Sequence, residues 1–446
     1  MNALCFDTRD LRPGDMFVAL RTGRRDGHEF LSQALEAGAT AALVEKQDMR
    51  VNIPQLLVDD TLEALHRVAA ETRKAFRAPV VGITGSCGKT STKDLLSLLL
   101  GPDVICTQGN YNNFIGMPLT LSRLCAGHSA AVVELGISQK GEMEPLARIL
   151  DPDIAIVTSV APAHLAGLGD MEGVASEKAG LPSVMGRDKR VLFPAYCLQW
   201  AAFCDLRARC FVTASMDEDT PLLPGPNYEL VRYQTFRSAC GGSDMLLFMP
   251  GQESFERFRL PRSSTGMRSN AALALAAALD MGAAADDLRA RLPQWKAASM
   301  RGELRHIGIV DYYVDCYNAN PASMLDSVQL FRETFPQGRR LFMLGCMNEL
   351  GAESELLHRQ LGERIGALDG ESFCIVGPAS EALRDGLVQA GARAESVHLA
   401  ADPAQAKALL DTFRNGCGSV LLKGSRSYRM EDYLPQDGSE KETAQC

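Results

Sequence analysis

The segment Gly85-Ser-Cys-Gly-Lys-Thr-Ser91 combines residue types that together can hold a phosphate group. Gly85 and Gly88 let the backbone turn tightly and approach a ligand closely. Lys89 can reach terminal phosphates, and the hydroxyl of Thr90 can hold Mg²⁺ beside them. We therefore predict that this segment, the phosphate cradle, binds nucleotide phosphate. Its residues are Gly85, Ser86, Cys87, Gly88, Lys89, Thr90 and Ser91.

The flanking residues place the cradle at the start of a helix. The apolar run at 80–83 is typical of a short buried strand, and leucines recur at helical spacing over 95–100. A helix N-terminus directs backbone N–H groups and a positive dipole toward an anion. Position 83 is isoleucine, so the full G-x-x-x-x-G-K-[ST] pattern is not met. A glycine turn without a ligand is the alternative, but the strand–turn–helix context favours ATP.

Length and composition limit the class of protein. A chain of 446 residues suggests roughly two to four domains. The net charge of −9 and the lack of a basic block argue against nucleic acid or an anionic membrane as the main partner. No apolar run is long enough to cross a membrane, and no signal-peptide layout is visible. Thirteen cysteines without C-x-x-C spacing favour reduced thiols, so we expect a cytoplasmic protein.

Alternating strand and helix patterns predict an α/β protein with three domains, at 1–78, 79–298 and 299–446. The first is small, with a long helix over 61–76 that Thr61 is expected to cap. The second carries the cradle on a largely parallel sheet. Residues 197–262 are expected to form short antiparallel strands and loops. The third is a further α/β unit resembling a Rossmann fold.

Two side chains are predicted beside the cradle because they follow strands of the same parallel sheet. Glu134 ends the apolar strand at 130–134, and His164 follows the strand at 153–158. Ligands of open parallel sheets bind beyond the carboxyl ends of the strands. A carboxylate there can hold Mg²⁺, although it can also cap a helix. Lys178 lies in a predicted helix, where a lone lysine is usually solvated.

Polar groups also follow strand ends in the third domain, at 315–320, 348–349 and 423–426. In the first domain, the polar segment Asp7-Thr-Arg9 and the loop at 21–28 are suited equally to a ligand or to a solvated turn.

The order of these segments resembles that of one known family. Its motifs are matched by 85–91, Gln108–Leu119, Cys316–Ser323, Met347–Gly351 and Lys423–Arg426, and in the first domain by 7–9, 12–20 and 26–28. On these residues the chain resembles the Mur ligase family over nearly its whole length. It most resembles the branch that joins D-alanyl-D-alanine to UDP-N-acetylmuramoyl-tripeptide. The resemblance implies a UDP-sugar domain, an ATP domain and an amine-binding domain, in that order.

The resemblance implies an activity that the residues are suited to perform. Transfer of the γ-phosphoryl of ATP to the peptide carboxylate gives an acyl phosphate, which an amine attacks. Phosphoryl transfer needs positioning and neutralised charge more than covalent chemistry from the protein. The implied catalytic residues are Lys89, His164 and Lys178, the last as a carbamate. The implied Mg²⁺ residues are Thr90, Glu134, His164 and Lys178; Asn270, Arg301, Asp315 and Asn318 would contact ATP outside the cradle.

The resemblance also assigns residues to UDP-N-acetylmuramoyl-tripeptide and D-alanyl-D-alanine. They are Thr8, Arg9, Asp26, His28, Asn110, Asn112, Asn113, Tyr317, Asn320, Lys423, Ser425 and Arg426. The third domain would have to close to complete the site, which would exclude water from the acyl phosphate. The family leads us to expect a monomer.

The chain departs from the family pattern at four positions: Cys346, Val314, Met267 and Ser159. Cys346 stands where a carboxylate near the amine is usual, which leaves open a related ligase with another amine or carboxylate substrate. Folylpolyglutamate synthase shares the ATP core but does not explain the first domain. A kinase or GTPase, or an inactive binding protein, explains fewer of the motifs.

Overall fold

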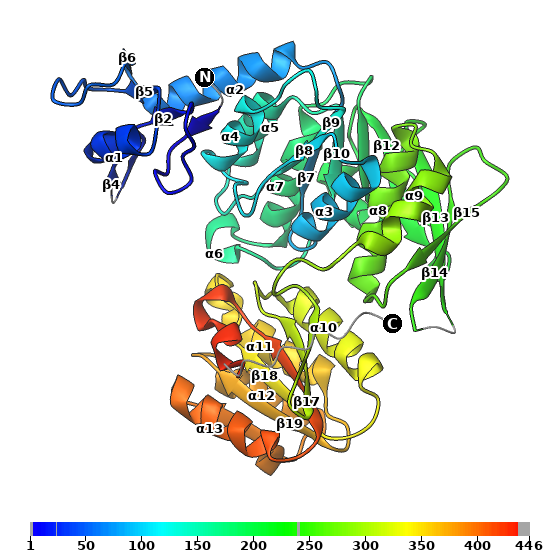
Figure 1. The fold of residues 1–446 in the computed structure, drawn as a ribbon. Coiled ribbons are helices and arrows are strands. Elements are labelled where there is room, and N and C mark those ends of the chain that lie inside the picture. Colours follow the sequence, from blue (N-terminus) through cyan, green and yellow to red (C-terminus); the bar gives the residue numbers. More distant parts are fainter. Residues whose placement is uncertain (1–2, 24, 239–240, 436–446) are drawn as a thin grey trace.

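The computed structural model describes residues 3–435 except 24, 239 and 240. It contains three α/β domains that follow one another along the chain (Figure 1). The N-terminal domain, in blue, lies beside the central domain, and the third domain, in yellow to red, lies below it. The predicted fold class is therefore confirmed. The exact boundaries at 78/79 and 298/299 stay predictions.

The N-terminal domain contains a four-stranded parallel sheet in the order β1-β2-β5-β6. Its helix α2 (Thr61–Ala75) is capped by Asp60, whose carboxylate accepts a bond from the Glu63 amide at 2.8 Å. The expectation that Thr61 caps this helix was wrong, because its side chain points into the domain. The remaining elements are β1 (Leu4–Cys5), β2 (Met16–Val18), β3 (Arg21–Thr22), β4 (Arg25–Asp26), η1 (Gly27–Phe30), α1 (Leu31–Glu36), β5 (Ala41–Val44) and β6 (Gln55–Leu57).

The central domain is built on a nine-stranded sheet in the order β15-β14-β13-β12-β11-β10-β7-β9-β8. Its strands are β7 (Val80–Thr84), β8 (Val104–Cys106), β9 (Ala130–Glu134), β10 (Ile154–Val157), β11 (Arg190–Pro194), β12 (Arg209–Ser215), β13 (Tyr228–Arg237), β14 (Ser243–Phe248) and β15 (Glu256–Leu260). Its helices are α3 (Lys89–Leu100), α4 (Gly116–Ser122), α5 (Met143–Leu150), α6 (Leu165–Leu168), α7 (Met171–Ser183), η2 (Ala195–Gln199), η3 (Ala201–Phe203), α8 (Thr265–Asp280), α9 (Ala285–Arg291) and η4 (Leu292–Gln294).

The region at 197–262 differs in part from the prediction of short antiparallel strands. β12 pairs in parallel with both β11 and β13, so the parallel sheet continues further than expected. Its residues Cys210–Ala214 are buried, as is usual for a strand covered on both faces. Within the described residues of 197–262, the antiparallel pairs are β13 with β14 and β14 with β15.

The third domain has a six-stranded sheet in the order β16-β17-β21-β18-β19-β20, parallel except for the β16–β17 pair. Its strands are β16 (Glu303–Ile307), β17 (Val310–Asp315), β18 (Arg340–Gly345), β19 (Glu371–Val376), β20 (Val397–Ala400) and β21 (Gly418–Lys423). Its helices are α10 (Pro321–Thr334), η5 (Gly351–Glu353), α11 (Ser354–Ile365), α12 (Ser380–Gln389), η6 (Ala394–Ser396), α13 (Pro403–Arg414), η7 (Arg426–Tyr428) and η8 (Met430–Tyr433).

Helix α8 is the element that supports the cradle from behind. Residues 271–278 of α8 are completely buried, and they pack with the leucines of α3 in one core. The small alanine side chains allow α8 to lie close to α3, which begins at the cradle. None of the helices in the described residues is long and apolar enough to span a membrane.

Candidate active site

A cavity of about 1010 Å³ opens between the central and third domains. Most residues that the sequence assigned to ATP, metal or amine binding line it. Those residues are Ser86, Cys87, Gly88, Lys89, Thr90, Ser91, Asn110, Asn112, Asn113, Glu134, His164, Asn270, Arg301, Asp315, Tyr317, Asn318, Asn320 and Lys423. The cavity therefore joins segments that lie more than three hundred residues apart in the chain.

The backbone of the cradle can be formed only with its two glycines. Gly88 is the N-cap of α3 with φ 82°, and no side chain caps the helix. A Cβ atom on Gly88 would lie 2.5 Å from the Asn270 amide, and one on Gly85 would lie 2.1 Å from the Thr158 hydroxyl. The first N–H groups of a helix need an acceptor. An anion seated in the cradle would supply it, so the cradle fits phosphate.

Lys89 begins α3, and its side chain turns back over the cradle. Its ammonium donates to the carbonyl of Gly85 at 2.7 Å and faces the cavity. Surrounding protein atoms lower its pKa by desolvation, and the carboxylate of Glu134 opposes this shift only in part. Among the described residues the ammonium has no carboxylate within ion-pair distance. An anionic ligand could therefore satisfy it.

Glu134 lies at the end of β9, where the sequence predicted it, and is 2% exposed. One carboxylate oxygen accepts from the Thr90 hydroxyl at 2.8 Å, and the other from the Asn112 amide at 2.7 Å. The predicted metal residues Thr90 and Glu134 are thus in direct contact. The described residues contain no cluster of three His, Cys, Asp or Glu side chains that could hold a metal by themselves.

His164 lies at the domain boundary in a left-handed backbone conformation, with φ 54°. Its Nδ1 contacts the carboxylate of Glu349, which comes from the third domain. Burial lowers the His164 pKa, Glu349 opposes this, and the charges of Lys178 and Lys89 lower it further. The predicted metal and catalytic residue therefore already has one carboxylate partner, while Nε2 is left for a ligand.

Lys178 is not a solvated residue of its helix. It projects from α7 into the protein and is 1% exposed, although it does not line the cavity. Burial, and then the positive charge of Lys89, lower its pKa well below the usual value. The expectation from its helical position alone was wrong, because α7 packs against the central sheet along this face.

The cradle region thus gathers basic groups whose positively charged forms are disfavoured by burial. Burial lowers the pKa of Lys89, Lys178 and His164, and the charge of Lys89 lowers the pKa of the other two further. The positive charge of Arg301 also lowers the pKa of Lys89. Unpaired charges in a desolvated site are costly, and a bound polyanion would remove this cost. The arrangement is suited to a triphosphate.

The third domain contributes a polar group to the opposite wall. Asp315, at the end of β17, forms an ion pair of 3.0 Å with Lys423, whose ammonium also donates to the Asn318 carbonyl at 2.9 Å. The guanidinium of Arg301 lies 3.9 Å from the ring centre of Tyr317. These side chains fix the loop that follows β17 so that it faces the cradle across the cavity.

Comparisons with known proteins agree with this geometry. Three family models match: Mur ligase family, catalytic domain (residues 2–73), Mur ligase middle domain (83–278), and Mur ligase, glutamate ligase domain (300–426). Together they span most of the chain. The chain belongs to the Mur ligase family.

Individual relatives match this Mur ligase over almost its full length. The UDP-N-acetylmuramoyl-tripeptide–D-alanyl-D-alanine ligase of Escherichia coli (strain K12) is 34% identical over 97% of this chain and 93% of its own. The enzyme of that name from Bacillus subtilis (strain 168) is 30% identical over 97% of this chain and 92% of its own. A crystal structure of MurF from Acinetobacter baumannii matches with a TM-score of 0.81, 28% identity, and 96% and 92% coverage. The crystal structure of MurF from Thermotoga maritima in complex with ADP matches with a TM-score of 0.78 and 26% identity, covering 97% of this chain and 96% of its own.

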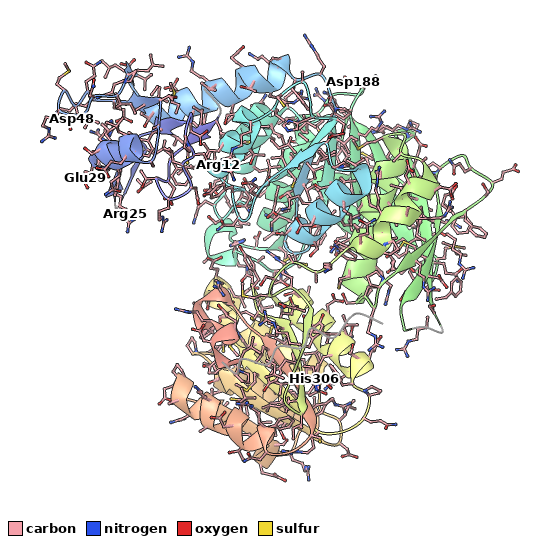
Figure 2. All side chains as sticks on the ribbon, in the orientation of Figure 1. Arg12, Arg25, Glu29, Asp48, Asp188 and His306 are labelled. Atoms are coloured by element: carbon pink, nitrogen blue, oxygen red, sulfur yellow. The ribbon has the colours of Figure 1, made fainter. Side chains whose placement is uncertain are left out.

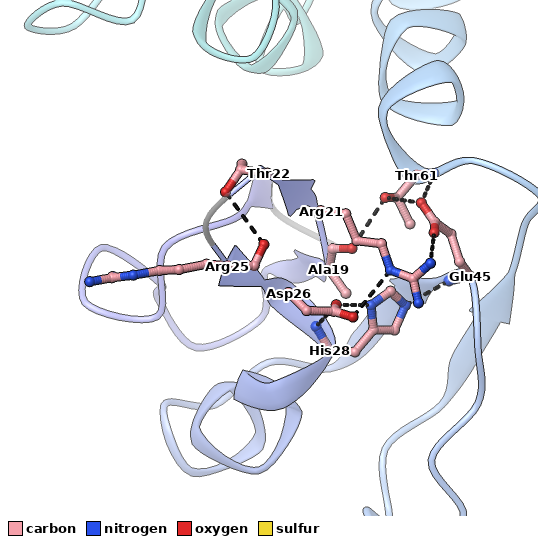
Figure 3. A network of polar contacts seen from close by, with 8 residues as sticks. All are labelled: Ala19, Arg21, Thr22, Arg25, Asp26, His28, Glu45 and Thr61. Atoms are coloured by element: carbon pink, nitrogen blue, oxygen red, sulfur yellow. Dashed lines mark hydrogen bonds and ion pairs between the residues drawn. The ribbon is translucent and has the colours of Figure 1, made fainter.

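Two substrate residues predicted in the N-terminal domain of this Mur ligase are used in an internal network (Figure 3). His28 donates through Nδ1 to Asp26 at 2.6 Å and accepts the Glu45 amide through Nε2 at 2.8 Å. Arg21 binds both Asp26 and Glu45, at 3.1 and 3.2 Å. Glu45 also accepts from Thr61. Asp26 and His28 lie outside the cavity, and their substrate role stays a prediction.

Other predicted residues also lie outside the cavity. Arg9 pairs with Asp7 on the surface, Ser425 accepts the Asn348 amide at 2.9 Å, and Arg426 pairs with Glu431. The predicted residues that do not line the cavity are Thr8, Arg9, Asp26, His28, Gly85, Lys178, Ser425 and Arg426. Figure 2 shows that Arg25 and Asp48 occupy the outer side of the N-terminal domain.

Two of the departures from the family pattern lie away from the cavity. Cys346 is 1% exposed, packs beside Gly377, and has a pKa raised to about 11 by burial. Val314 is buried in the third-domain core. Met267 and Ser159 do line the cavity, and Ser159 accepts the amide of Cys87 in the cradle at 2.9 Å.

Several lining residues were missed by the sequence reasoning. Tyr196 accepts the Val160 amide at 3.0 Å, and Asp326 lies where α10 meets α8. Thr213, Glu218 and Tyr233 complete the wall formed by β12 and β13. No motif marks these positions. Tyr196 and Glu218 follow strands β11 and β12, which is the signal that identified Glu134, whereas Thr213 and Tyr233 lie within strands and Asp326 lies within helix α10.

Proposed function

We propose that this chain is an ATP-dependent ligase that joins D-alanyl-D-alanine to UDP-N-acetylmuramoyl-tripeptide in the cytoplasm. The observation that supports this best is the cradle at the start of α3, near which Lys89 and Lys178 lie desolvated; within the part of the chain that the structure describes, neither has a carboxylate in ion-pair range. The relatives from E. coli and B. subtilis bear the name of this activity. The T. maritima relative was solved with ADP.

The cradle would hold ATP by its phosphates. The free N–H groups at the start of α3 would bind phosphate oxygens, and Lys89 would bind the β- and γ-phosphates. Asn270 and Arg301 from one wall, and Asp315 and Asn318 from the other, would hold the remainder of the nucleotide. This positions the γ-phosphoryl group for transfer to the peptide carboxylate. Attack of the amine on the resulting acyl phosphate forms the amide and releases phosphate.

Mg²⁺ would neutralise charge on the transferred phosphoryl group. Thr90 and Glu134, already 2.8 Å apart, and Nε2 of His164 are suited to hold it. Lys178 would carry a carbamate, formed by attack of its neutral amine on carbon dioxide with loss of a proton. Its lowered pKa favours the neutral amine, and the carbamate would place a negative charge beside Lys89.

The two other substrates would enter from opposite sides of the cavity. The segment at 108–119 touches the N-terminal domain, because the Tyr111 hydroxyl donates to Asp10 at 2.9 Å and His66 contacts the Phe114 carbonyl at 2.7 Å. Asn110, Asn112 and Asn113 would therefore hold the UDP-linked peptide. The amine would bind on the third-domain side, near Tyr317, Asn320 and Lys423.

Phosphate release from ATP tests this proposal. We expect release only when UDP-N-acetylmuramoyl-tripeptide and D-alanyl-D-alanine are both present, with a pentapeptide product in the mass spectrum. Release that depends on another amine instead would assign the chain to a related ligase. Release with neither acceptor would refute ligation.

A further inference from the structure

A partly buried carboxylate of the third domain binds the N-terminus of α8 in the central domain. Asp326 projects from α10, which lies on the side of the third domain turned toward the central domain (Figure 1). It accepts the Gly266 amide at 3.0 Å and the hydroxyl of Ser264. Ser264 is itself the N-cap of α8 and accepts the Met267 amide at 3.1 Å. A carboxylate is favourable there because it faces the positive end of the helix.

The close approach of the two domains depends on a glycine. A Cβ atom on Gly266 would lie 2.8 Å from Oδ2 of Asp326, which is too near for an unchanged contact. Burial raises the pKa of Asp326, while the bonds from Ser264 and Gly266 lower it. The protein thus partly buries a carboxylate at the domain boundary and supplies two donors for it.

On the central-domain side, this contact leads to the cradle within one helical turn. Asn270 follows Gly266 by four residues, and its side chain lies against Gly88. A shift of the N-terminus of α8 would therefore move the amide that closes one side of the cradle. Because residues 271–278 of α8 are completely buried and close-packed, a shift of α8 would also displace α3.

On the third-domain side, the next residue along α10 holds the nucleotide-facing loop. The hydroxyl of Ser327 donates to Asp315, and Asp315 pairs with Lys423 at 3.0 Å. The two carboxylates are also near one another, because the charge of Asp315 raises the pKa of Asp326. The contact at Asp326 thus connects the wall with Asn270 to the wall with Asp315.

We propose that Asp326 is a positioning residue that latches the third domain onto α8 and so aligns the two walls of the nucleotide site. This inference rests on the proposed function only in taking the cavity to bind ATP. Without the latch, Asn270 and Asp315 would still be present but would not be held at a fixed separation. Binding of the nucleotide would then have to order the two domains and would weaken accordingly.

The chain offers a matched control on the same helix. Glu333 also belongs to α10 and also reaches the central domain, where it pairs with Arg237 at 3.1 Å. That pair is largely exposed, with 80% and 49% of the side chains accessible. Exposed ion pairs contribute little to stability. Glu333→Gln therefore removes a cross-domain charge without touching the cavity.

The first test is calorimetric titration of the intact protein with Mg²⁺ and the non-hydrolysable ATP analogue AMPPNP. We expect Asp326→Ala to raise Kd by about tenfold, equivalent to about 1.4 kcal/mol. Asp326→Asn, which keeps one oxygen acceptor, should have a smaller effect, and Glu333→Gln should leave Kd within about twofold of the wild type. Wild-type affinity in Asp326→Ala, or an equal loss in Glu333→Gln, would overturn the latch.

A second variant separates the contact from the charge. Gly266→Ala keeps Asp326 but forces its carboxylate away, so it should raise Kd as Asp326→Ala does. The double variant should be no worse than either single variant, because both remove one interaction. Additive effects would contradict the latch. If Asp326→Ala does not fold, the Kd of Gly266→Ala alone tests the latch.

X-ray scattering without nucleotide distinguishes failure of the latch from failure of the proposed function. We expect a larger radius of gyration for Asp326→Ala than for the wild type and for Glu333→Gln. If the wild type does not bind AMPPNP, ATP-dependent ligation is refuted, but the scattering comparison still tests the latch. Identical radii in all three proteins would overturn it.

Discussion

Two charged regions of this Mur ligase differ in how their charges are balanced. In the N-terminal domain, Arg21, Asp26, His28 and Glu45 form a closed network in which each ionic group has a partner of the same domain. Around the cradle, Lys89 and Lys178 are desolvated, and the charge of Lys89 lowers the pKa of Lys178.

This difference indicates that the N-terminal network stabilises the fold, whereas the basic groups around the cradle serve to bind a ligand. A network that satisfies itself needs no ligand to be stable, and it fixes the loop that carries it. Basic groups held in a desolvated site are kept at a cost to stability, as is typical of sites that bind an opposite charge. The comparison predicts that substitutions in the first region weaken the fold, and substitutions in the second weaken binding.

The largest effect is expected from Lys89→Ala. Turnover should fall by at least about 10³-fold, because the main cation for the transferred phosphoryl group is lost. The melting temperature should not fall, because a desolvated charge is removed. Ligase assays and calorimetry measure the two effects, with Lys74→Ala, on an exposed pair with Glu71, as the control. Retained turnover would refute the role of Lys89.

Lys178→Met should abolish most activity while stabilising the fold. The pKa of Lys178 is lower in the folded protein than its usual value of about 10.4 in the unfolded chain. The unfolded state therefore binds more protons, and wild-type stability should rise with pH up to that value. In carbon dioxide-free buffer, the variant should be more stable than the wild type at pH 7, with the gap narrowing toward pH 10. A lower melting temperature in the variant would contradict this account.

His28→Ala should destabilise the N-terminal domain and leave nucleotide binding unchanged. The Glu45 amide would lose its acceptor and Asp26 its closest donor, which costs about 1–3 kcal/mol. Urea unfolding measures the loss, and His398→Ala, at an exposed site in the third domain, is the control. Weaker AMPPNP binding in His28→Ala would break the distinction between the two regions.

The smallest effect concerns a pair on the outer surface. Asp48, labelled in Figure 2, is bound by Arg50 at 2.8 Å, and this lowers its pKa to about 2. Because the folded pKa is depressed, any stabilisation is present above the unfolded value of about 3.9 and is lost as pH falls toward 2. Arg50→Ala should raise the pKa, followed by NMR, part of the way toward about 3.9 without changing activity, because the side-chain bonds are lost while the amide of residue 50 still donates to Asp48. An unchanged pKa would show that Arg50 is not its cause.

The sequence predicted what depends on neighbouring residues and missed what depends on distant ones. The cradle and Glu134 could be located because a strand, a turn and a helix follow one another in the chain. The burial of Lys178 could not, since it depends on how α7 packs against the sheet. The helix cap was predicted at Thr61, one residue after the actual cap, Asp60. The contact of Asp326 with Gly266 could not be predicted, because the two residues lie sixty positions apart in the chain.

The measurement that tests the contrast most directly is the shift in melting temperature on adding Mg²⁺ and AMPPNP. A ligand at about one hundred times its Kd stabilises the native state by about 2.7 kcal/mol. We predict a full shift in the wild type and in His28→Ala, and none in Lys89→Ala. An undiminished shift in Lys89→Ala, or its loss in His28→Ala, would contradict the assignment of the unpaired charges to nucleotide binding.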